Sequence, residues 1–220
     1  MIVAVFNLWQ LILKGGPMMW PLILLSIAAL AVAMEKIVYL SSIEKVWRVH
    51  KGKVFQSLQK ESIQQTLSLC ESLKNPFGRI IKAGLLKFGN ASDVIKTAME
   101  EAFLYESYRL KERMSILNFV MNVSALIGLL GTVIGLTTVF HSIQVRSNVL
   151  NPLSVGDVSV GIWQALFSTV LGLMVCILSF SAYSFCASQI NNLIADLQIT
   201  MAKALQVLAQ RDQLNESPQR

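Results

Sequence analysis

Three long stretches of this chain carry no charged residue, and they constrain its fold more than any other feature. They lie between Lys14 and Glu35 (20 residues), between Arg113 and Arg146 (32 residues) and between Asp157 and Asp196 (38 residues). A helix needs about 20 apolar residues to cross a bilayer core of roughly 30 Å. Each stretch holds one span, and three spans is the economical count. The sequence therefore predicts an all-α membrane protein with three transmembrane helices.

The charged residues are concentrated between the first two spans. Residues 41–117 hold 13 of the 19 Lys and Arg against 8 of the 13 Asp and Glu, whereas the segment between the second and third spans holds only Arg146 and Asp157. Basic residues accumulate in cytoplasmic loops. We therefore expect 41–117 in the cytoplasm, the N-terminus outside and the C-terminus inside. The net charge of +6 is a topology signal, so we expect a lipid environment and no nucleic-acid partner.

Helical periodicity extends the second and third spans beyond the membrane. From a helix start at Ser92 or Asp93, the chain has no helix breaker up to the second span, so we expect one rod that enters the bilayer. After the third span, residues 190–208 keep an apolar stripe at helical spacing. Spans two and three are therefore predicted to continue as long helices into a helical cytoplasmic domain.

The predicted organisation has seven parts along the chain. They are an interfacial outer-face helix (1–14), the first transmembrane helix (15–40), a cytoplasmic helical region (41–113), the second transmembrane helix (114–142), an outer loop (143–159), the third transmembrane helix (160–185), and a cytoplasmic C-terminal helix and tail (186–220).

Small residues recur on one face of each of the last two spans. Lipid does not drive helices together by the hydrophobic effect, so small residues lie where backbones approach closely. This predicts a helix-packing or partner-contact role, in which the glycines need do nothing more. The residues are Ser124, Gly128, Gly131 and Gly135 on the second span, and Gly161, Ala165 and Gly172 on the third.

Polar side chains near the midpoints of these spans admit a second interpretation. Thr132, Thr169, Ser168 and Gln164 could together line a narrow wet path or receive a partner helix. Alternatively, each Thr hydroxyl could simply bond to a carbonyl of its own helix. Neither span carries a titratable carboxylate, whereas a proton path through lipid normally uses an ionisable group. If the protein conducts protons, that group must come from another chain.

No enzyme or cofactor signature is present in the sequence. It has no phosphate-binding loop, no GxSxG and no HExxH. His50 and His141 lie outside the span centres, and Cys70, Cys176 and Cys186 have no metal-ligand spacing. We expect a protein that is not an enzyme and that needs no metal or cofactor.

Three stretches together resemble the MotA/TolQ/ExbB family of proton-channel subunits, and its ExbB/TolQ branch in particular. They are "GGPMMWPLILLSIAALAVAMEK" (15–36), "ALIGLLGTVIGL" (125–136) and "GIWQALFSTVLGL" (161–173). Their order, their separations and the three-span topology together make the resemblance specific. It covers most of the chain, although 41–113 matches in character more than in motif.

The resemblance implies a pentamer in the bacterial inner membrane, with a periplasmic N-terminus. The ring would surround the transmembrane helices of a smaller ExbD- or TolR-like partner that supplies one membrane aspartate. Proton-motive force would drive the partner, and a TonB- or TolA-like protein could receive the energy. The family's motif threonines match Thr132 and Thr169, which would then face the lumen.

The chain departs from the family pattern in three places. Well-known members carry a glutamate where this chain has Gln164, a proline where it has Ala125, and "AIP" where it reads "CIL" (176–178). Gln164 can form hydrogen bonds but cannot titrate. Two other functions therefore stay open: a passive membrane scaffold whose small-residue stripes only pack, and a MotA-like flagellar stator subunit, although that branch uses four spans.

Overall fold

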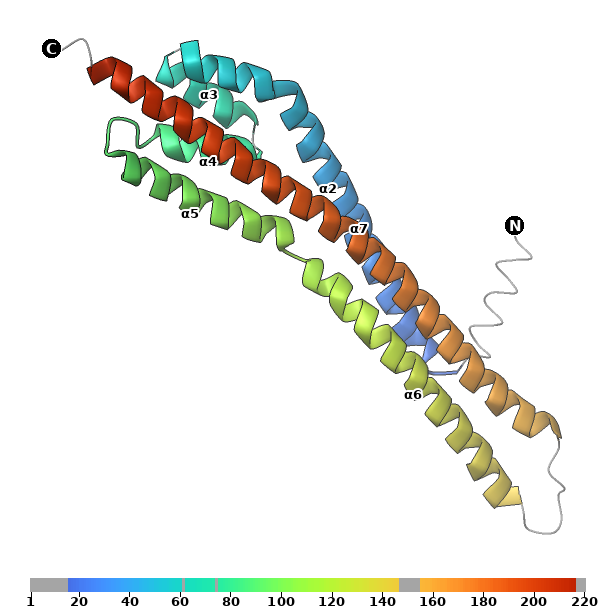
Figure 1. Cartoon of the computed structure of the whole chain (residues 1–220). Helices are drawn as coiled ribbons and strands as arrows, with labels where there is room; N and C mark the ends of the chain where they lie inside the picture. The colour runs from blue at the N-terminus through green and yellow to red at the C-terminus, as the bar shows by residue number, and fades with distance from the viewer. Residues whose placement is uncertain (1–15, 61, 74, 147–154, 217–220) are drawn as a thin grey trace. The chain divides into compact units, whose positions relative to one another are not determined.

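The computed structural model describes residues 16–60, 62–73, 75–146 and 155–216, and all regular structure within these ranges is α-helical. Three helical segments are long and apolar enough to cross a membrane, which confirms the predicted all-α fold with three spans. The helices are α2 (Met19–Lys60), α3 (Ile63–Leu73), α4 (Pro76–Leu85), α5 (Ser92–Lys111), α6 (Met114–Arg146) and α7 (Val155–Glu216) (Figure 1).

The chain divides into two compact units. Unit 1 is formed by residues up to Met34 together with Arg113–Phe185, and unit 2 by Glu35–Glu112 together with Cys186–Arg220. Helices α2 and α7 belong to both units, because each continues without interruption across the division. Both helices are much longer than a membrane span. The sequence predicted this length for α7, which contains the third span.

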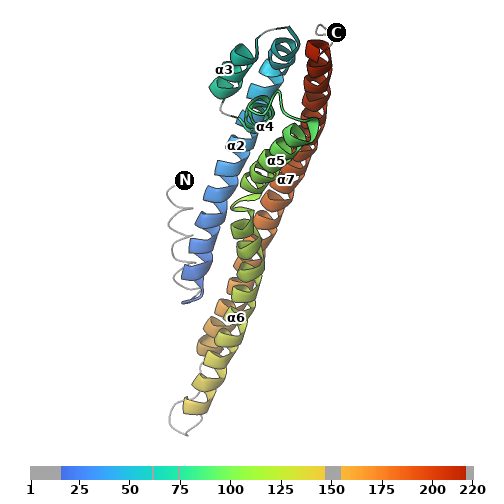
Figure 2. The same cartoon turned by 90° about the vertical axis from the view of Figure 1, so that its left-hand side faces the viewer.

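Unit 1 is the apolar unit. It contains the start of α2, all of α6 and the first half of α7, and α6 and α7 run side by side in two perpendicular views (Figure 2). Its described part carries only three charged residues, namely Arg113, Arg146 and Asp157. Large apolar side chains face outward, among them Leu126, Leu129 and Phe140, each at least 60% exposed. Such an exterior suits lipid.

The predicted single rod from Ser92 into the second span is wrong in one detail. The helix stops at Lys111 and a new one starts at Met114, with Arg113 in the left-handed region at φ +64°. A non-glycine residue pays about 1–2 kcal/mol for that conformation. Because the sequence here contains neither Gly nor Pro, the break has no local signal.

Unit 2 has a core of large side chains built around α4. Asn75 caps this helix by accepting a hydrogen bond from the Gly78 amide, and Pro76 follows at the first helical position. The Phe77 ring is fully buried and stacks on Trp47 of α2, with ring centroids 4.2 Å apart. Helix α4 also packs against α3 and α5. Unit 2 is thus held together by a core of large apolar and aromatic side chains.

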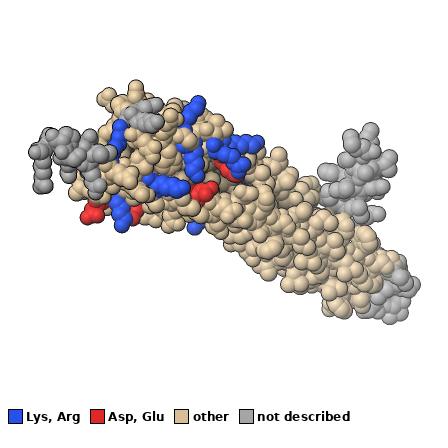
Figure 3. Space-filling view, turned by 45° about the horizontal axis from the view of Figure 1, so that its top comes forward, with Lys and Arg blue, Asp and Glu red and all other residues tan. Residues whose placement is uncertain are grey.

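Unit 2 also contains ion pairs and a buried thiol. The charged side chains visible in Figure 3 lie on its surface. Arg79 of α4 donates from Nη2 to Oε2 of the buried Glu106 of α5 at 2.8 Å, and its Nε forms an ion pair with Oε1 of the same carboxylate at 2.7 Å. Arg211 of α7 donates to the Leu58 carbonyl of α2 at 3.1 Å. Burial raises the pKa of the Cys70 thiol from 9.0 to about 11, so it stays protonated at neutral pH.

Some predicted parts lie outside the described residues. These are the interfacial helix at 1–14, residues 147–154 of the loop predicted at 143–159 and the last four residues of the tail. The described ends of that predicted loop are helical, because α6 continues to Arg146 and α7 begins at Val155.

Candidate functional site

The small-residue stripes of the second and third spans meet each other within one chain. Ser124, Gly128, Gly131 and Gly135 of α6 are all buried, and so are Gly161, Ala165, Ser168 and Gly172 of α7. The residues face each other in antiparallel order, since Gly128 lies against Gly172 and Gly135 lies against Ala165. The two faces that the sequence singled out therefore form one interface.

The closest approach is between the backbones of Gly128 and Gly172. A Cβ added to Gly172 would lie 2.7 Å from both the Gly128 Cα and the Ser124 carbonyl oxygen. A Cβ added to Gly128 would lie 3.1 Å from the Gly172 Cα. Because the obstacles are backbone atoms, no side-chain rotation relieves them. Glycine at position 172 is a requirement of the helix crossing, and position 128 leaves only marginal room for a larger residue.

The same crossing continues on either side of this pair. A Cβ on Gly135 would lie 2.7 Å from the Ala165 Cβ. A Cβ on Gly131 would collide with the Ser168 side chain, and one on Gly161 would collide with Val139. Val139 therefore also belongs to this interface, although the sequence analysis did not single it out. Only its helical spacing from Gly135 could have placed it on the same face.

The hydroxyl groups at the interface have partners inside the chain. The Thr169 hydroxyl donates to the Gly128 carbonyl across the helix pair at 3.0 Å. Ser168 donates to the Ala165 carbonyl at 2.8 Å, and Ser124 to the Met121 carbonyl at 3.3 Å. Thr132 donates to the Leu129 carbonyl of its own helix. Thr132 and Thr169 are half-buried within the chain, whereas Ser168 and Ser124 are fully buried.

Gln164 lies against the start of the first span. Gly16, which adopts φ +79° just before α2, has no room for a Cβ because the Gln164 carboxamide occupies that place. The left-handed φ favours glycine at position 16, whereas the Gln164 carboxamide is the movable end of a flexible side chain. The sequence did not connect Gln164 with Gly16, and the two are 148 positions apart.

A shallow apolar cavity lies between α2 and α7 in unit 1. Its volume is about 280 Å³. Ser26, Ala29, Leu30 and Ala33 line it from α2, and Val175, Leu178, Ser179 and Ala182 line it from α7. It is built from small and aliphatic side chains and offers no charged group to a ligand.

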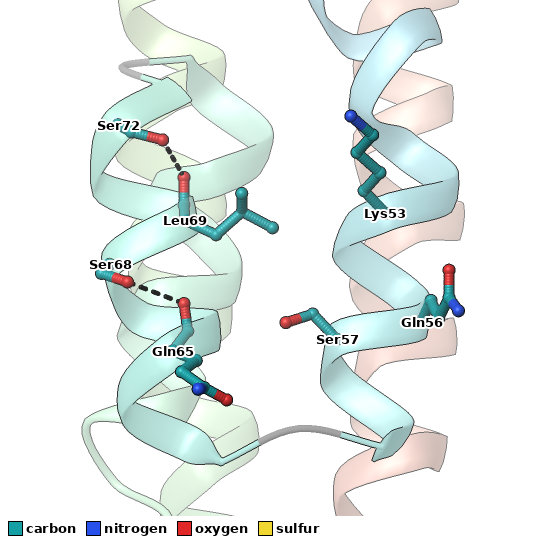
Figure 4. Close-up of a pocket in the computed structure, with 7 residues that line it drawn as sticks. All are labelled: Lys53, Gln56, Ser57, Gln65, Ser68, Leu69 and Ser72. Atoms are coloured by element: carbon teal, nitrogen blue, oxygen red, sulfur yellow. Dashed lines mark hydrogen bonds between the residues drawn. The ribbon is translucent and has the colours of Figure 1, made fainter.

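Unit 2 has a larger, more polar groove between α2 and α3, of about 500 Å³ (Figure 4). Ser57 of α2 points toward α3, and Lys53 is the one charged residue of the lining. The Ser68 and Ser72 hydroxyls donate to the Gln65 and Leu69 carbonyls of their own helix. The protons of those two hydroxyls are therefore used within α3. The described ranges also contain no group of three His, Cys, Asp or Glu that could hold a metal ion.

Comparison with known proteins assigns the chain to a family. Residues 72–199 match the profile described as the MotA/TolQ/ExbB proton channel family. The match includes α4, α5, α6 and α7 as far as residue 199.

Three relatives carry ExbB names. A protein named as an ExbB homologue from Methanothermobacter thermautotrophicus is 29% identical over 84% of this chain and 65% of its own length. Two Synechocystis proteins, ExbB-like 1 and ExbB-like 3, are 27% and 29% identical over 78% and 75% of this chain. The matches cover 67% and 78% of the lengths of these two proteins. The chain therefore spans about two thirds of the Methanothermobacter protein and of ExbB-like 1. With three apolar spans, a tight crossing of α6 and α7 and a profile match over more than half its length, the chain belongs to the MotA/TolQ/ExbB proton channel family.

Proposed function

We propose that this chain is the ExbB/TolQ-like subunit of a proton-driven, energy-transducing complex in a bacterial inner membrane. Several copies, five by family resemblance, would form a ring around the transmembrane helices of an ExbD- or TolR-like protein. Its N-terminus would be periplasmic and its charged unit 2 cytoplasmic. The complex would pass energy to a TonB- or TolA-like protein or to another envelope system.

The observation that carries the proposal is a polar interface without a titratable group. Residues 114–145 and 158–195 contain no Asp, Glu, Lys or Arg, yet the helix pair places four hydroxyls near its middle. A proton path needs an ionisable group. In a complex, a membrane aspartate on the partner would supply the ionisable group. This chain would supply the hydroxyls and an apolar helix surface around them.

Within this proposal the candidate residues have different tasks. Thr132 and Thr169 are half-buried in the single chain, so each hydroxyl oxygen retains a lone pair that a partner could use. Ser168 lies deeper, against Gly131, and would hold that helix surface in register. Gln164 would anchor the first span at Gly16 and would not take part in proton transfer, since an amide does not titrate.

The first test is the double variant Thr132→Val and Thr169→Val, measured as proton flux into vesicles that contain the complex with its partner. We expect proton-driven work to be lost while the ring still assembles, because Val keeps the shape of Thr. Thr137→Val with Thr138→Val is the matched control, since those two hydroxyls also bond within α6. Unchanged flux in the first variant would refute the role of the two threonines.

A passive scaffold is the second candidate, and one observation favours it. Each of the four hydroxyls already donates to a carbonyl of this chain, so none requires a lumen. Native mass spectrometry of the purified chain, alone and co-expressed with a single-span neighbour that carries a membrane Asp, separates the two functions. Retention of the neighbour inside a ring supports the motor, and a ring or dimer that never holds it supports the scaffold.

A MotA-like stator subunit is a weaker alternative. That branch uses four spans, whereas the described part of this chain has three candidates.

A further inference from the structure

The break between α5 and α6 has no cause in the local sequence. Residues 92–118 contain neither Gly nor Pro. The buried positions keep one helical spacing across the break, at Met99, Glu106, Leu110, Met114 and Leu117. A continuous helix would therefore bury the same face and would avoid the left-handed conformation of Arg113. A contact from elsewhere in the fold must favour the break.

Lys36 of α2 makes such a contact. Its side chain is buried, with only 5% of the residue exposed, and its Nζ donates to the Leu110 carbonyl at 3.1 Å. In an uninterrupted helix that carbonyl would accept from the amide four residues later, which is Met114. The lysine ammonium thus competes for the carbonyl to which the helix would need to bond in order to continue. Both residues belong to unit 2.

The charge of Lys36 adds to this effect. The last carbonyls of a helix carry partial negative charge, so a cation at this end stabilises the terminus. The Tyr39 ring lies 5.8 Å from Nζ and offers its π-face to the same cation. A buried ammonium without such partners would be very costly. The Glu112 amide donates to the Tyr108 and Arg109 carbonyls. The last turn of α5 therefore has its usual hydrogen bonds up to the Leu110 carbonyl, to which Lys36 donates.

We propose that Lys36 is the positioning residue that ends α5. By taking the Leu110 carbonyl, it separates the helix of unit 2 from the membrane helix α6, and Arg113 adopts its left-handed conformation as a consequence. The inference concerns a joint in the chain and does not depend on the proposed proton-driven function.

Amide hydrogen exchange of the full chain in detergent micelles or lipid nanodiscs tests this proposal. In the native protein we expect the Met114 amide to exchange fast, because the first amides of α6 have no carbonyl four residues back within that helix. In Lys36→Met, the Leu110 carbonyl is released and the Met114 amide can bond to it. We expect its exchange to slow at least tenfold. Lys36→Arg, which keeps a cationic donor, should retain fast exchange.

Two further variants provide the control and the rescue. Lys45→Met removes an exposed lysine from the same helix and should change nothing at Met114. Arg113→Gly favours the left-handed conformation, so adding it to Lys36→Met should restore fast exchange. Unchanged or faster exchange at Met114 in Lys36→Met, or slow exchange that Arg113→Gly does not reverse, would overturn the proposal.

A second route applies if Lys36→Met does not accumulate in the membrane. Arg113→Ala raises the helix propensity of the joint while Lys36 remains in place. If Lys36 controls the break, Met114 exchange stays fast in this variant. Slow exchange would mean that Arg113 itself sets the break, and the proposal would be wrong.

Discussion

The α6–α7 pair of unit 1 and the α4-centred core of unit 2 solve the packing problem in opposite ways. Where α6 crosses α7, the residues in closest contact are mainly Gly, Ala and Ser, and the backbones nearly touch at Gly128 and Gly172. In the α4-centred core, large side chains are buried: Phe77, which stacks on Trp47, and Ile80 and Ile81 of the same helix. The difference follows from the solvent. In water, burial of large apolar surface stabilises the fold. In lipid, only close contact between helices and satisfied polar groups do so.

This contrast predicts which substitutions each unit tolerates. Removing a large side chain should damage unit 2 most, and adding a methyl group should damage unit 1 most.

The largest effect is expected from Phe77→Ala in unit 2. The ring is fully buried and stacked on Trp47, and loss of such a side chain costs about 3–5 kcal/mol. Denaturant unfolding in detergent micelles, followed by circular dichroism and Trp fluorescence, measures the loss. Val49→Ala is the control on α2, because Val49 is 70% exposed and should change the free energy of unfolding by less than about 0.5 kcal/mol. Equal losses would contradict the assignment of the core.

The next effect is expected from Arg79→Met, also in unit 2. The variant leaves the buried Glu106 carboxylate with only Arg109, 3.8 Å away, and should cost about 2–3 kcal/mol, below the full value because Arg79 is partly exposed. Adding Glu106→Gln removes the buried charge and should recover part of the loss. The same unfolding experiment measures both variants, and a double variant less stable than the single one would disprove the pairing.

A single methyl group should reveal the contrast most directly. Gly172→Ala places a Cβ against the backbone of α6 and should destabilise unit 1 by about 1–3 kcal/mol. Gly52→Ala on α2, where nothing lies within 4 Å, should instead stabilise the helix by about 0.5–1 kcal/mol. Unfolding of both variants in the same detergent gives the two signs. Stabilisation by Gly172→Ala would refute the close crossing.

The smallest effect is expected from Thr169→Val. It removes the hydrogen bond from α7 to the Gly128 carbonyl, and such interhelical bonds in membranes contribute about 0.6 kcal/mol on average. Thr138→Val is the control, because its hydroxyl bonds only within α6. Subtracting the control from the variant isolates the bond between the helices, and a zero difference would mean that this bond adds nothing to stability.

Much of the fold could be predicted from charge and periodicity. The three charge-free stretches predicted the spans, and the structure confirms them. The continued apolar stripe after the third span predicted the long helix α7. These features depend on hydrocarbon thickness and on the helical repeat, which are the same for every chain.

The candidate site was only partly readable. Spacing grouped Ser124, Gly128 and Gly135 on one face, but it could not show that their neighbours are Gly161, Ala165 and Gly172 of the same chain. Nor could it show that Thr169 bonds across the pair while Thr132 bonds back to its own helix. Which stripe meets which depends on distances between backbones that a one-dimensional pattern does not contain. Whether Thr132, Thr169, Ser168 and Gln164 line a lumen stays a prediction.

The distribution of charge along the chain is enough to specify three helical spans, because a long run without charge is stable only in hydrocarbon or in a core. How those helices meet and where α5 ends depend on contacts between residues far apart in the sequence. The Leu110 carbonyl can accept from the Met114 amide or from the Lys36 ammonium. That choice sets a local backbone bond against one made by a residue 74 positions away. Helix propensity and periodicity describe residues that are neighbours along the chain. They could therefore not predict the contact between Lys36 and the Leu110 carbonyl.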